Sequence, residues 1–257
     1  MVSEAEERHA RPSVIPSLDT AISMPDIALI TGATEGIGRA SALAFGRAGY
    51  RVGVCARTAP RVAGLIEELR AAGIDAAGRP GDVAAEEDVA AIVATVEREL
   101  GPVDVLVNNA GVLIGRRLED LSLDEWDTTM ATNVRSLFLM TRRVLPGMRE
   151  RRRGTIVNVA SVSGKVGFVG GTAYAASKHA VMGFSRSLML EVRRDGVRVV
   201  AVCPGSVATR MLNDQPLLQA DPEKILAPED VAETILQAVR LPARALVNEI
   251  EIRPTDP

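Results

Sequence analysis

Tyr174 and Lys178 are the two side chains in this sequence whose types and spacing best suit proton transfer. They stand four positions apart in the segment YAASK, so on a helix they lie on the same face, one turn from each other. Reduction of a carbonyl needs a proton on the nascent alkoxide, and a tyrosine with its ordinary pKa of about 10 is too weak an acid for this at neutral pH. The positive charge of a neighbouring lysine favours the tyrosinate. The pair therefore predicts an acid/base centre with Tyr174 as proton donor and acceptor.

Ser161 offers a second polar group to such a centre. It stands thirteen residues before Tyr174, just after an apolar run, and its hydroxyl suits a fixed donor to a substrate oxygen, as in an oxyanion hole. Each residue alone has a plainer alternative, because a helical tyrosine commonly packs in a core and a serine-rich segment after a strand is commonly only a turn. The combination favours the catalytic interpretation if a fold brings the residues together.

The elements that would position these residues follow one another as short apolar runs and helical patterns. Such alternation predicts βαβ units, and unbroken apolar runs are typical of strands covered on both faces. We therefore predict an α/β, doubly wound Rossmann fold with about seven parallel strands and helices on both faces, in one domain over residues 26–257. The expected strands include IALIT, RVGVCA, VDVLVN, TIVNVA, VRVVAV and one near 246–252, and the expected helices include about 60–72, 86–100, 124–149, 173–193 and one from Pro228.

A glycine-rich turn, TGATEGIG at residues 31–38, follows the first expected strand and leads into a helix. Glycines there let the backbone turn tightly and approach a pyrophosphate, whose charge lies at the helix N-terminus. A turn without a ligand is the alternative, since glycine-rich motifs have a real false-positive rate. The place of this turn between a strand and a helix favours dinucleotide binding.

The composition indicates no nucleic-acid or membrane partner. Hydrophobic residues make up 47%, charged residues 25% and the net charge is -3, as in an ordinary globular protein without an overall basic field. Arg142, Arg143 and the arginine-rich run from Arg149 to Arg153 cluster at the end of an expected helix, where cations complement the helix dipole. Cys55 and Cys203 share no metal-ligand spacing with His9 or His179, so we expect no metal site and a reducing cytoplasm.

Two segments stand outside the alternating pattern. Residues 1–25 carry early acids and several prolines but no continuous apolar run, so we expect a flexible N-terminal extension rather than a signal or a membrane span. The segment from about Gly205 to Ala227 is long and irregular. Loops of this length are usually lids or binding loops, and we expect this one to close over substrate.

Taken together, the motifs resemble those of the short-chain dehydrogenase/reductase family over about Asp26 to Ile252. The glycine turn resembles the family's T-G-x-x-x-G-x-G, and the further matches are Asn108-Asn109-Ala110-Gly111 after the fourth strand, the Y-x-x-x-K of Tyr174 to Lys178, Ser161 at its thirteen-residue interval, Asn133 on the long helix and Pro204-Gly205 after the sixth strand. The resemblance implies a catalytic set of Asn133, Ser161, Tyr174 and Lys178, in which Asn133 holds a water that links the lysine to a proton relay.

The resemblance also implies a nicotinamide cofactor, with the adenine ring at Asp82 and Val83 and the carboxamide at Val207 and Thr209. The full set of implied cofactor contacts is Gly32, Thr34, Glu35, Gly36, Ile37, Gly38, Arg57, Asp82, Val83, Asn109, Ala110, Gly111, Tyr174, Lys178, Pro204, Gly205, Val207 and Thr209.

The end of the second strand indicates which nicotinamide cofactor is preferred. NAD-specific members place an acid there, whereas this sequence reads Cys55-Ala56-Arg57. An arginine after a small residue accommodates and pairs with a 2′-phosphate, so we predict NADP rather than NAD; an exposed arginine at a strand end is the alternative. Glu35 departs from the pattern, because many NADP-using members carry a basic residue in its place.

The implied activity is an NADP-dependent oxidoreductase that interconverts a carbonyl and an alcohol on a small molecule. The stretch from Ser161 to Lys178 resembles 3-oxoacyl-carrier-protein reductases, whereas the ending NEIEIRPT resembles enzymes that oxidise small hydroxy acids or reduce assorted carbonyls, and analogy of fold cannot choose between them. A catalytically silent dinucleotide-sensing regulator and an assembly scaffold are alternatives of another class. Lys165 and Arg210 are the charges expected near an anionic substrate. Family members commonly pair their long helices, so we expect a homo-oligomer, a dimer or a tetramer.

Overall fold

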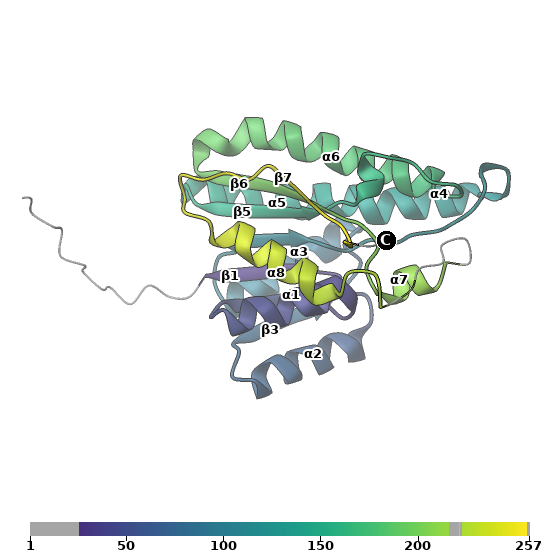
Figure 1. The fold of residues 1–257 in the computed structure, drawn as a ribbon. Helices are drawn as coiled ribbons and strands as arrows, with labels where there is room; N and C mark the ends of the chain where they lie inside the picture. Colours follow the sequence, from purple (N-terminus) through teal and green to yellow (C-terminus); the bar gives the residue numbers. More distant parts are fainter. Residues whose placement is uncertain (1–25, 216–220, 222, 256–257) are drawn as a thin grey trace, which may run out of the picture.

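A seven-stranded sheet, with every strand parallel to its neighbours, forms the middle layer of the molecule (Figure 1). The computed structural model describes residues 26–215, 221 and 223–255, so the predicted extension over residues 1–25 and part of the predicted lid lie outside the described residues. The strand order is β3-β2-β1-β4-β5-β6-β7, which confirms the predicted doubly wound sheet. The strands are β1 (Ile27–Thr31), β2 (Arg51–Ala56), β3 (Ala76–Pro80), β4 (Val105–Asn108), β5 (Gly154–Val159), β6 (Val197–Pro204) and β7 (Glu249–Ile252).

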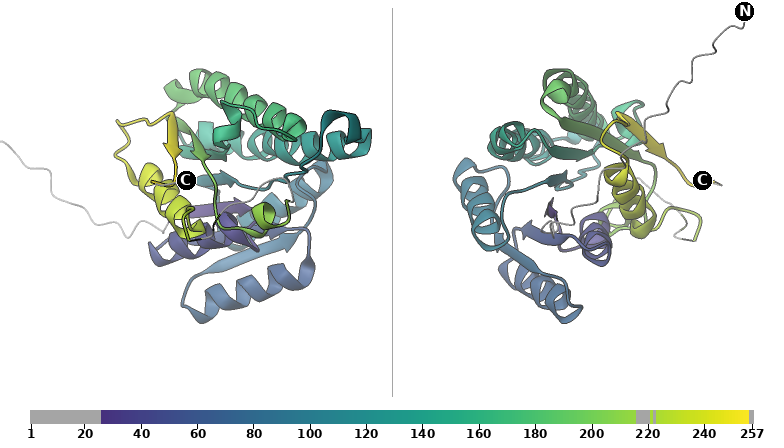
Figure 2. Two further views of the ribbon diagram at one scale, coloured as in Figure 1. Left: turned by 45° about the vertical axis from the view of Figure 1, so that its right-hand side comes forward. Right: turned by 90° about the vertical axis from the view of Figure 1, so that its left-hand side faces the viewer.

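Helices cover both faces of this sheet (Figure 2). α1, α2 and α8 enclose one apolar core, and α3, α5 and α6 enclose a second core on the other side. β1 is buried along its whole length, as an apolar strand covered on both faces must be. The α-helices are α1 (Gly36–Arg47), α2 (Ala59–Ala71), α3 (Glu86–Glu99), α4 (Leu123–Met130), α5 (Ser136–Glu150), α6 (Thr172–Val192), α7 (Arg210–Asn213) and α8 (Pro228–Arg240).

The long helix predicted over about 124–149 is interrupted. α4 and α5 are joined without a gap by five residues of π-helix, Ala131–Arg135. Apolar periodicity does not reveal such a turn, because one extra residue in it leaves the helical pattern intact on either side. π-helical turns inside α-helices are frequent at functional sites, and this one carries Asn133.

The last strand and the predicted lid also differ in detail from the expectation. β7 begins at Glu249 rather than near Leu246, and the segment after β6 contains the short helix α7.

None of the helices in the described part of the chain is long and apolar enough to cross a bilayer.

The order of the strands places the expected site residues together. The chain turns outward in opposite directions from the adjacent strands β1 and β4, and ligands of doubly wound sheets bind beyond the carboxyl ends of the strands at this switch point. The glycine turn follows β1, Asn109 follows β4, Ser161 follows β5 and Gly205 follows β6. All four segments therefore leave the sheet at the same edge.

Candidate active site

The glycine turn after β1 is built so that a ligand can approach the backbone closely. Gly32 and Gly36 have φ values of 61° and 53°, in the left-handed region that favours glycine. A Cβ on Gly38 would lie 2.2 Å from the carbonyl oxygen of Gly32. No side chain caps α1 and its first turn holds no acid, so its N-terminal N–H groups and dipole suit a phosphate. The turn fits the pyrophosphate of a dinucleotide.

Thr31 and Asn109 hold the two sides of the switch point together. The buried Thr31 hydroxyl accepts hydrogen bonds from the backbone N–H groups of Asn109 and Ala110, each at 3.0 Å. In return, Asn109 Nδ2 donates to the carbonyls of Thr31 and Gly32 at 3.0 and 3.2 Å. Sequence reasoning did not single out Thr31 as a positioning residue, although a threonine at the end of an apolar strand, directly before the glycines, was a usable signal.

Asn133 acts on the backbone beside this switch point. Its Oδ1 accepts from the Val112 N–H at 2.7 Å, and its Nδ2 donates to the Val112 carbonyl at 2.9 Å and to Ser177 Oγ at 3.0 Å. The side chain is buried and belongs to the π-helical turn. Asn133 therefore holds the segment that follows β4 in place and links it to α6 through Ser177. Ser177 is a second contact that the sequence did not indicate.

Tyr174 and Lys178 lie on one face of α6, as their spacing predicts. Tyr174 is 8% exposed and Lys178 5% exposed, and Lys178 Nζ lies 5.6 Å from the centroid of the tyrosine ring. Lys178 Nζ donates a hydrogen bond of 2.8 Å to the carbonyl of Val159, at the end of β5. The lysine is thereby held between the tyrosine and the sheet.

Burial moves the pKa values of both groups toward their neutral forms. Desolvation raises the pKa of Tyr174 to about 12, while the Ser161 hydroxyl acts in the opposite direction. Desolvation lowers the pKa of Lys178 to about 8. At neutral pH the protein without ligand therefore holds a protonated phenol beside a mostly charged lysine. This phenol is a weaker acid than an ordinary tyrosine, so proton transfer needs nearby positive charge that lowers its pKa.

Ser161 opens the short 3-10 turn Val162–Gly164 after β5. Its Oγ accepts a hydrogen bond of 3.0 Å from the Ser163 N–H, which orients the hydroxyl while leaving its proton for another acceptor. The backbone N–H of Ser163 therefore holds the Ser161 hydroxyl in place.

A cavity of about 490 Å³ brings most of these residues together. Ser161, Tyr174 and Lys178 line it with the predicted contacts Pro204, Gly205, Val207 and Thr209. Six apolar side chains also line it and form its apolar wall: Leu113, Val162, Val166, Phe168, Met211 and Leu212. Asn133 does not line the cavity, and its side chain lies behind it against Val112.

A second cavity of about 220 Å³ adjoins the first and contains the predicted adenosine contacts. The two cavities share Ile37, Asn109, Gly111, Thr209 and Met211. The second is further lined by Gly32, Thr34, Glu35, Gly36, Arg57, Asp82, Val83 and Ala110. Gly38 lines neither cavity, because it lies beneath the turn against the Gly32 carbonyl.

Glu35 does not stand alone in the second cavity. Its carboxylate forms an ion pair of 3.1 Å with Arg61 in the first turn of α2, and Arg210 lies 4.0 Å away. Arg61 lines the same cavity as Arg57. The acid that departs from the usual NADP pattern is thus offset by two arginines that sequence reasoning did not associate with it.

The structure corrects the expectation for Lys165. Its ammonium group contacts Glu249 and pairs with Glu251 at 2.7 Å, and it does not line the cavity at Tyr174. The residue was expected there because it follows Ser161 closely in sequence, but both carboxylates come from β7, far along the chain. Arg253 lines that cavity instead, and the sequence did not single it out.

Comparison with known proteins agrees with this geometry. Residues 26–218 match the family model described as short chain dehydrogenase. A putative ketoacyl reductase of Streptomyces coelicolor is 47% identical over 188 residues, which cover 72% of each chain. The 3-oxoacyl-acyl-carrier-protein reductase FabG of Pseudomonas aeruginosa is 40% identical over 195 residues, or 76% of this chain and 79% of that protein.

Solved structures resemble the whole fold. A variant of actinorhodin polyketide ketoreductase with NADPH has a TM-score of 0.82 and 38% identity, covering 89% of this chain and 95% of its own. The closed form of a serine dehydrogenase with NADP+ also has a TM-score of 0.82, with 34% identity and coverage of 89% and 94%. The family match and these similarities confirm the resemblance drawn from the motifs: the chain belongs to the short-chain dehydrogenase family and is an oxidoreductase of CH–OH and keto groups.

Proposed function

We propose that this chain interconverts a carbonyl and a primary or secondary alcohol, with NADP(H) as its cofactor and Tyr174 as the proton donor and acceptor. The observation that carries the proposal is the buried pair of Tyr174 and Lys178 beside Ser161, in a cavity that adjoins the glycine-lined one. Bound NADP(H) would supply or accept the hydride.

Four side chains have distinct roles in the proposed reaction. The Ser161 hydroxyl donates to the substrate oxygen and holds it toward the phenol, an electrostatic role of the oxyanion-hole kind. Tyr174 gives its proton to that oxygen in reduction and takes it back in oxidation. Lys178 adds positive charge next to the phenol, and Asn133 keeps the Val112 backbone and α6 in register. The apolar side chains that line the cavity leave few other polar groups to compete for the reacting oxygen.

The preference for NADP(H) follows from the charges of the second cavity. Arg57 lines it and, within the described residues, has no ion pair, so its guanidinium is free to bind a 2′-phosphate bidentately. Arg61 lines the same cavity and neutralises the Glu35 carboxylate there. The structural neighbours that hold NADPH or NADP+ support this assignment.

Reduction of a ketoacyl group is the second candidate for the reaction. It is favoured by relatives named ketoacyl reductase and FabG. The exposed Val166, which lines the cavity, would suit the acyl chain. Both candidates use the same residues and differ only in what lies beyond the carbonyl carbon.

Self-association stays a prediction. Phe138 on α5 and Leu190 on α6 are large apolar side chains that the described chain leaves exposed, as the pairing of long helices in a homo-oligomer requires. Light scattering decides between monomer, dimer and tetramer.

The experiment that tests the proposed function is a panel of ketones, ketoacyl thioesters and alcohols assayed with NADP(H) and NAD(H) in parallel. Wild type should turn over part of the panel with NADP(H) preferred, and Tyr174→Phe should lose about two to four orders of magnitude in kcat. Tyr50→Phe is the matched control, because that ring packs against Phe45 away from both cavities. Binding of NADPH without turnover of any compound would instead support the silent regulator, and no binding at all would support the scaffold.

A further inference from the structure

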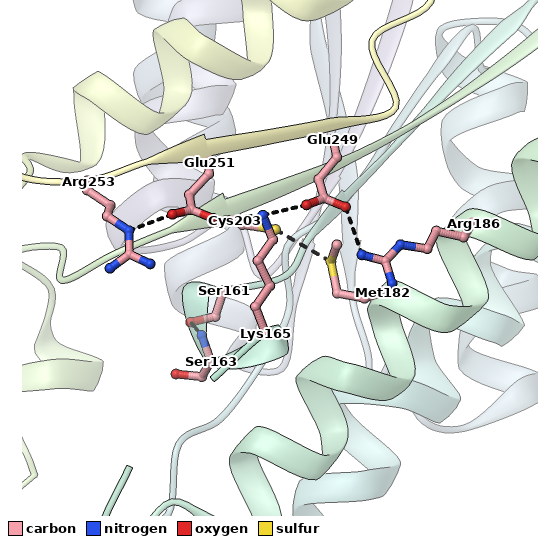
Figure 3. Close-up of polar contacts among 9 residues, drawn as sticks. All are labelled: Ser161, Ser163, Lys165, Met182, Arg186, Cys203, Glu249, Glu251 and Arg253. Atoms are coloured by element: carbon pink, nitrogen blue, oxygen red, sulfur yellow. Dashed lines mark hydrogen bonds and ion pairs between the residues drawn. The ribbon is translucent and has the colours of Figure 1, made fainter. Parts of the chain in front are cut away.

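A ladder of alternating charges runs along β7 on the side of the sheet that faces Ser161 (Figure 3). Arg186 of α6 pairs with Glu249 at 3.0 Å, Glu249 contacts Lys165, Lys165 pairs with Glu251 at 2.7 Å, and Glu251 accepts from Arg253 Nε at 2.5 Å. Residues two apart on a strand face the same side, so Glu249, Glu251 and Arg253 project together.

The ladder contains three cations and two carboxylates, so one positive charge is left over. Lys165 lies in the middle and serves both acids. Its bonds to them lower the pKa values of Glu249 and Glu251 and raise its own, which keeps all three groups charged. The excess charge therefore belongs to the two ends, Arg186 and Arg253.

Only one of these two ends reaches the candidate active site. Arg253 follows β7 directly beside Gly205, where a Cβ on that glycine would lie 3.5 Å from the Arg253 Cα. It lines the cavity that contains Ser161 and Tyr174, whereas Arg186 does not. Besides Lys178, which is buried against Tyr174, Arg253 is the one charged residue among the described residues that line this cavity.

The guanidinium of Arg253 keeps N–H donors that have no partner within the described residues. Nε is the atom bound to Glu251, and neither terminal amino group has a protein partner within the described residues. Glu251 thus orients the group and leaves its paired N–H donors exposed. A carboxylate is the anion whose two oxygens match such a pair of parallel donors.

We propose that Arg253 binds the carboxylate of a short hydroxy or oxo acid whose alcohol or carbonyl carbon lies at Tyr174. This inference rests on the proposed function and names its substrate class. It separates the two candidates above, because a ketoacyl thioester has no carboxylate to offer and a small oxo acid has one.

The test compares substrates that differ only in charge. NADP+-dependent oxidation of 2-hydroxybutyrate and 3-hydroxybutyrate, both enantiomers of each, is measured beside that of their methyl esters, for wild type, Arg253→Gln and Arg186→Gln. Arg186→Gln is the matched control, since it removes the opposite end of the same ladder. Butyrate is added as an inhibitor of ester oxidation, which reports anion binding without turnover of an acid.

Wild type should oxidise an acid with a higher kcat/KM than its ester. Arg253→Gln should raise KM for the acid and the inhibition constant of butyrate by about tenfold or more, the loss expected for a charge-assisted hydrogen bond. KM for the ester and for NADP+ should stay within about twofold, and Arg186→Gln should move none of these values, since surface substitutions away from a site have small effects.

Three results would overturn the inference. The first is that wild type has the same kcat/KM for the ester as for the acid. The second is that Arg253→Gln raises KM for the ester as much as KM for the acid. The third is a rise in KM for NADP+, which would assign Arg253 to the cofactor. Each of these requires turnover and so leaves the proposed function standing, whereas a wild type that oxidises no alcohol and reduces no ketone overturns both.

Discussion

The ionisation of Tyr174 can be followed in isolation, because the chain has only two tyrosines. Tyr50→Phe removes the other one and keeps the ring that packs edge-on against Phe45, with centroids 5.0 Å apart. The remaining phenol should titrate at about pH 12 in the protein without ligand, since burial raises the pKa of Tyr174 to about 12. Lys178, with a pKa of about 8, loses its proton first and no longer helps at that pH.

These pKa values give the size of the shift that bound NADP+ should cause in the pKa of Tyr174. Ionising a phenol of pKa about 12 at neutral pH costs roughly 7 kcal/mol, at about 1.4 kcal/mol per pH unit. Lys178 Nζ lies 5.6 Å from the ring centroid, and one positive charge at such a distance offsets about 3 kcal/mol at an effective dielectric constant of about 20. The positive nicotinamide of NADP+ would offset a similar amount. Each charge is thus equivalent to about two pKa units, and the two together bring the phenol near its working pH.

The assay is the ultraviolet absorbance of tyrosinate during a titration of Tyr50→Phe, measured against a variant that also carries Tyr174→Phe. At pH 10, where half of an ordinary tyrosine is ionised, only about 1% of this phenol should be. Saturating NADP+ should lower the midpoint by about two units and NADPH should not, because its nicotinamide carries no charge. A midpoint near neutral pH without ligand would refute the desolvation argument. An equal shift with both cofactors would refute the assignment of the effect to charge.

The remaining predictions concern the residues around the cofactor cavity. Asn133→Ala leaves the partly buried Val112 N–H without its 2.7 Å acceptor, so the free energy of unfolding in urea should fall by about 1–3 kcal/mol; an unchanged value would contradict this structural role. Glu35→Gln frees Arg61 from a 3.1 Å ion pair and should lower KM for NADPH about threefold, in line with an exposed pair, whereas a parallel fall for NADH would show a cause other than the phosphate. Gly38→Ala places a Cβ 2.2 Å from a carbonyl oxygen of the turn and should abolish NADPH binding in a fluorescence titration, while retained affinity would show that the turn can move.

Much of the fold and of the candidate site could be read from local patterns. The strand IALIT is apolar up to Thr31 and buried along its length, and the spacing of Tyr174 and Lys178 on a helix already implies one face. Local periodicity failed at the π-helical turn of Asn133, because an inserted residue changes the path of the backbone without changing the apolar pattern around it.

The sequence by itself determined the sheet, the glycine turn and the placement of Tyr174 and Lys178 on one helix face, since each depends on residues that are neighbours along the chain. Only the tertiary structure decided which cations form ion pairs and which one lines the cavity. Lys165 stands near Ser161 in sequence, yet it is committed to Glu251, which is 86 residues away. Arg253 joins the cavity because β7 pairs with β6 and ends at Gly205. Residues so distant in sequence come into contact only when the sheet is assembled. A local sequence pattern therefore cannot show which arginine or lysine keeps N–H donors without a protein partner.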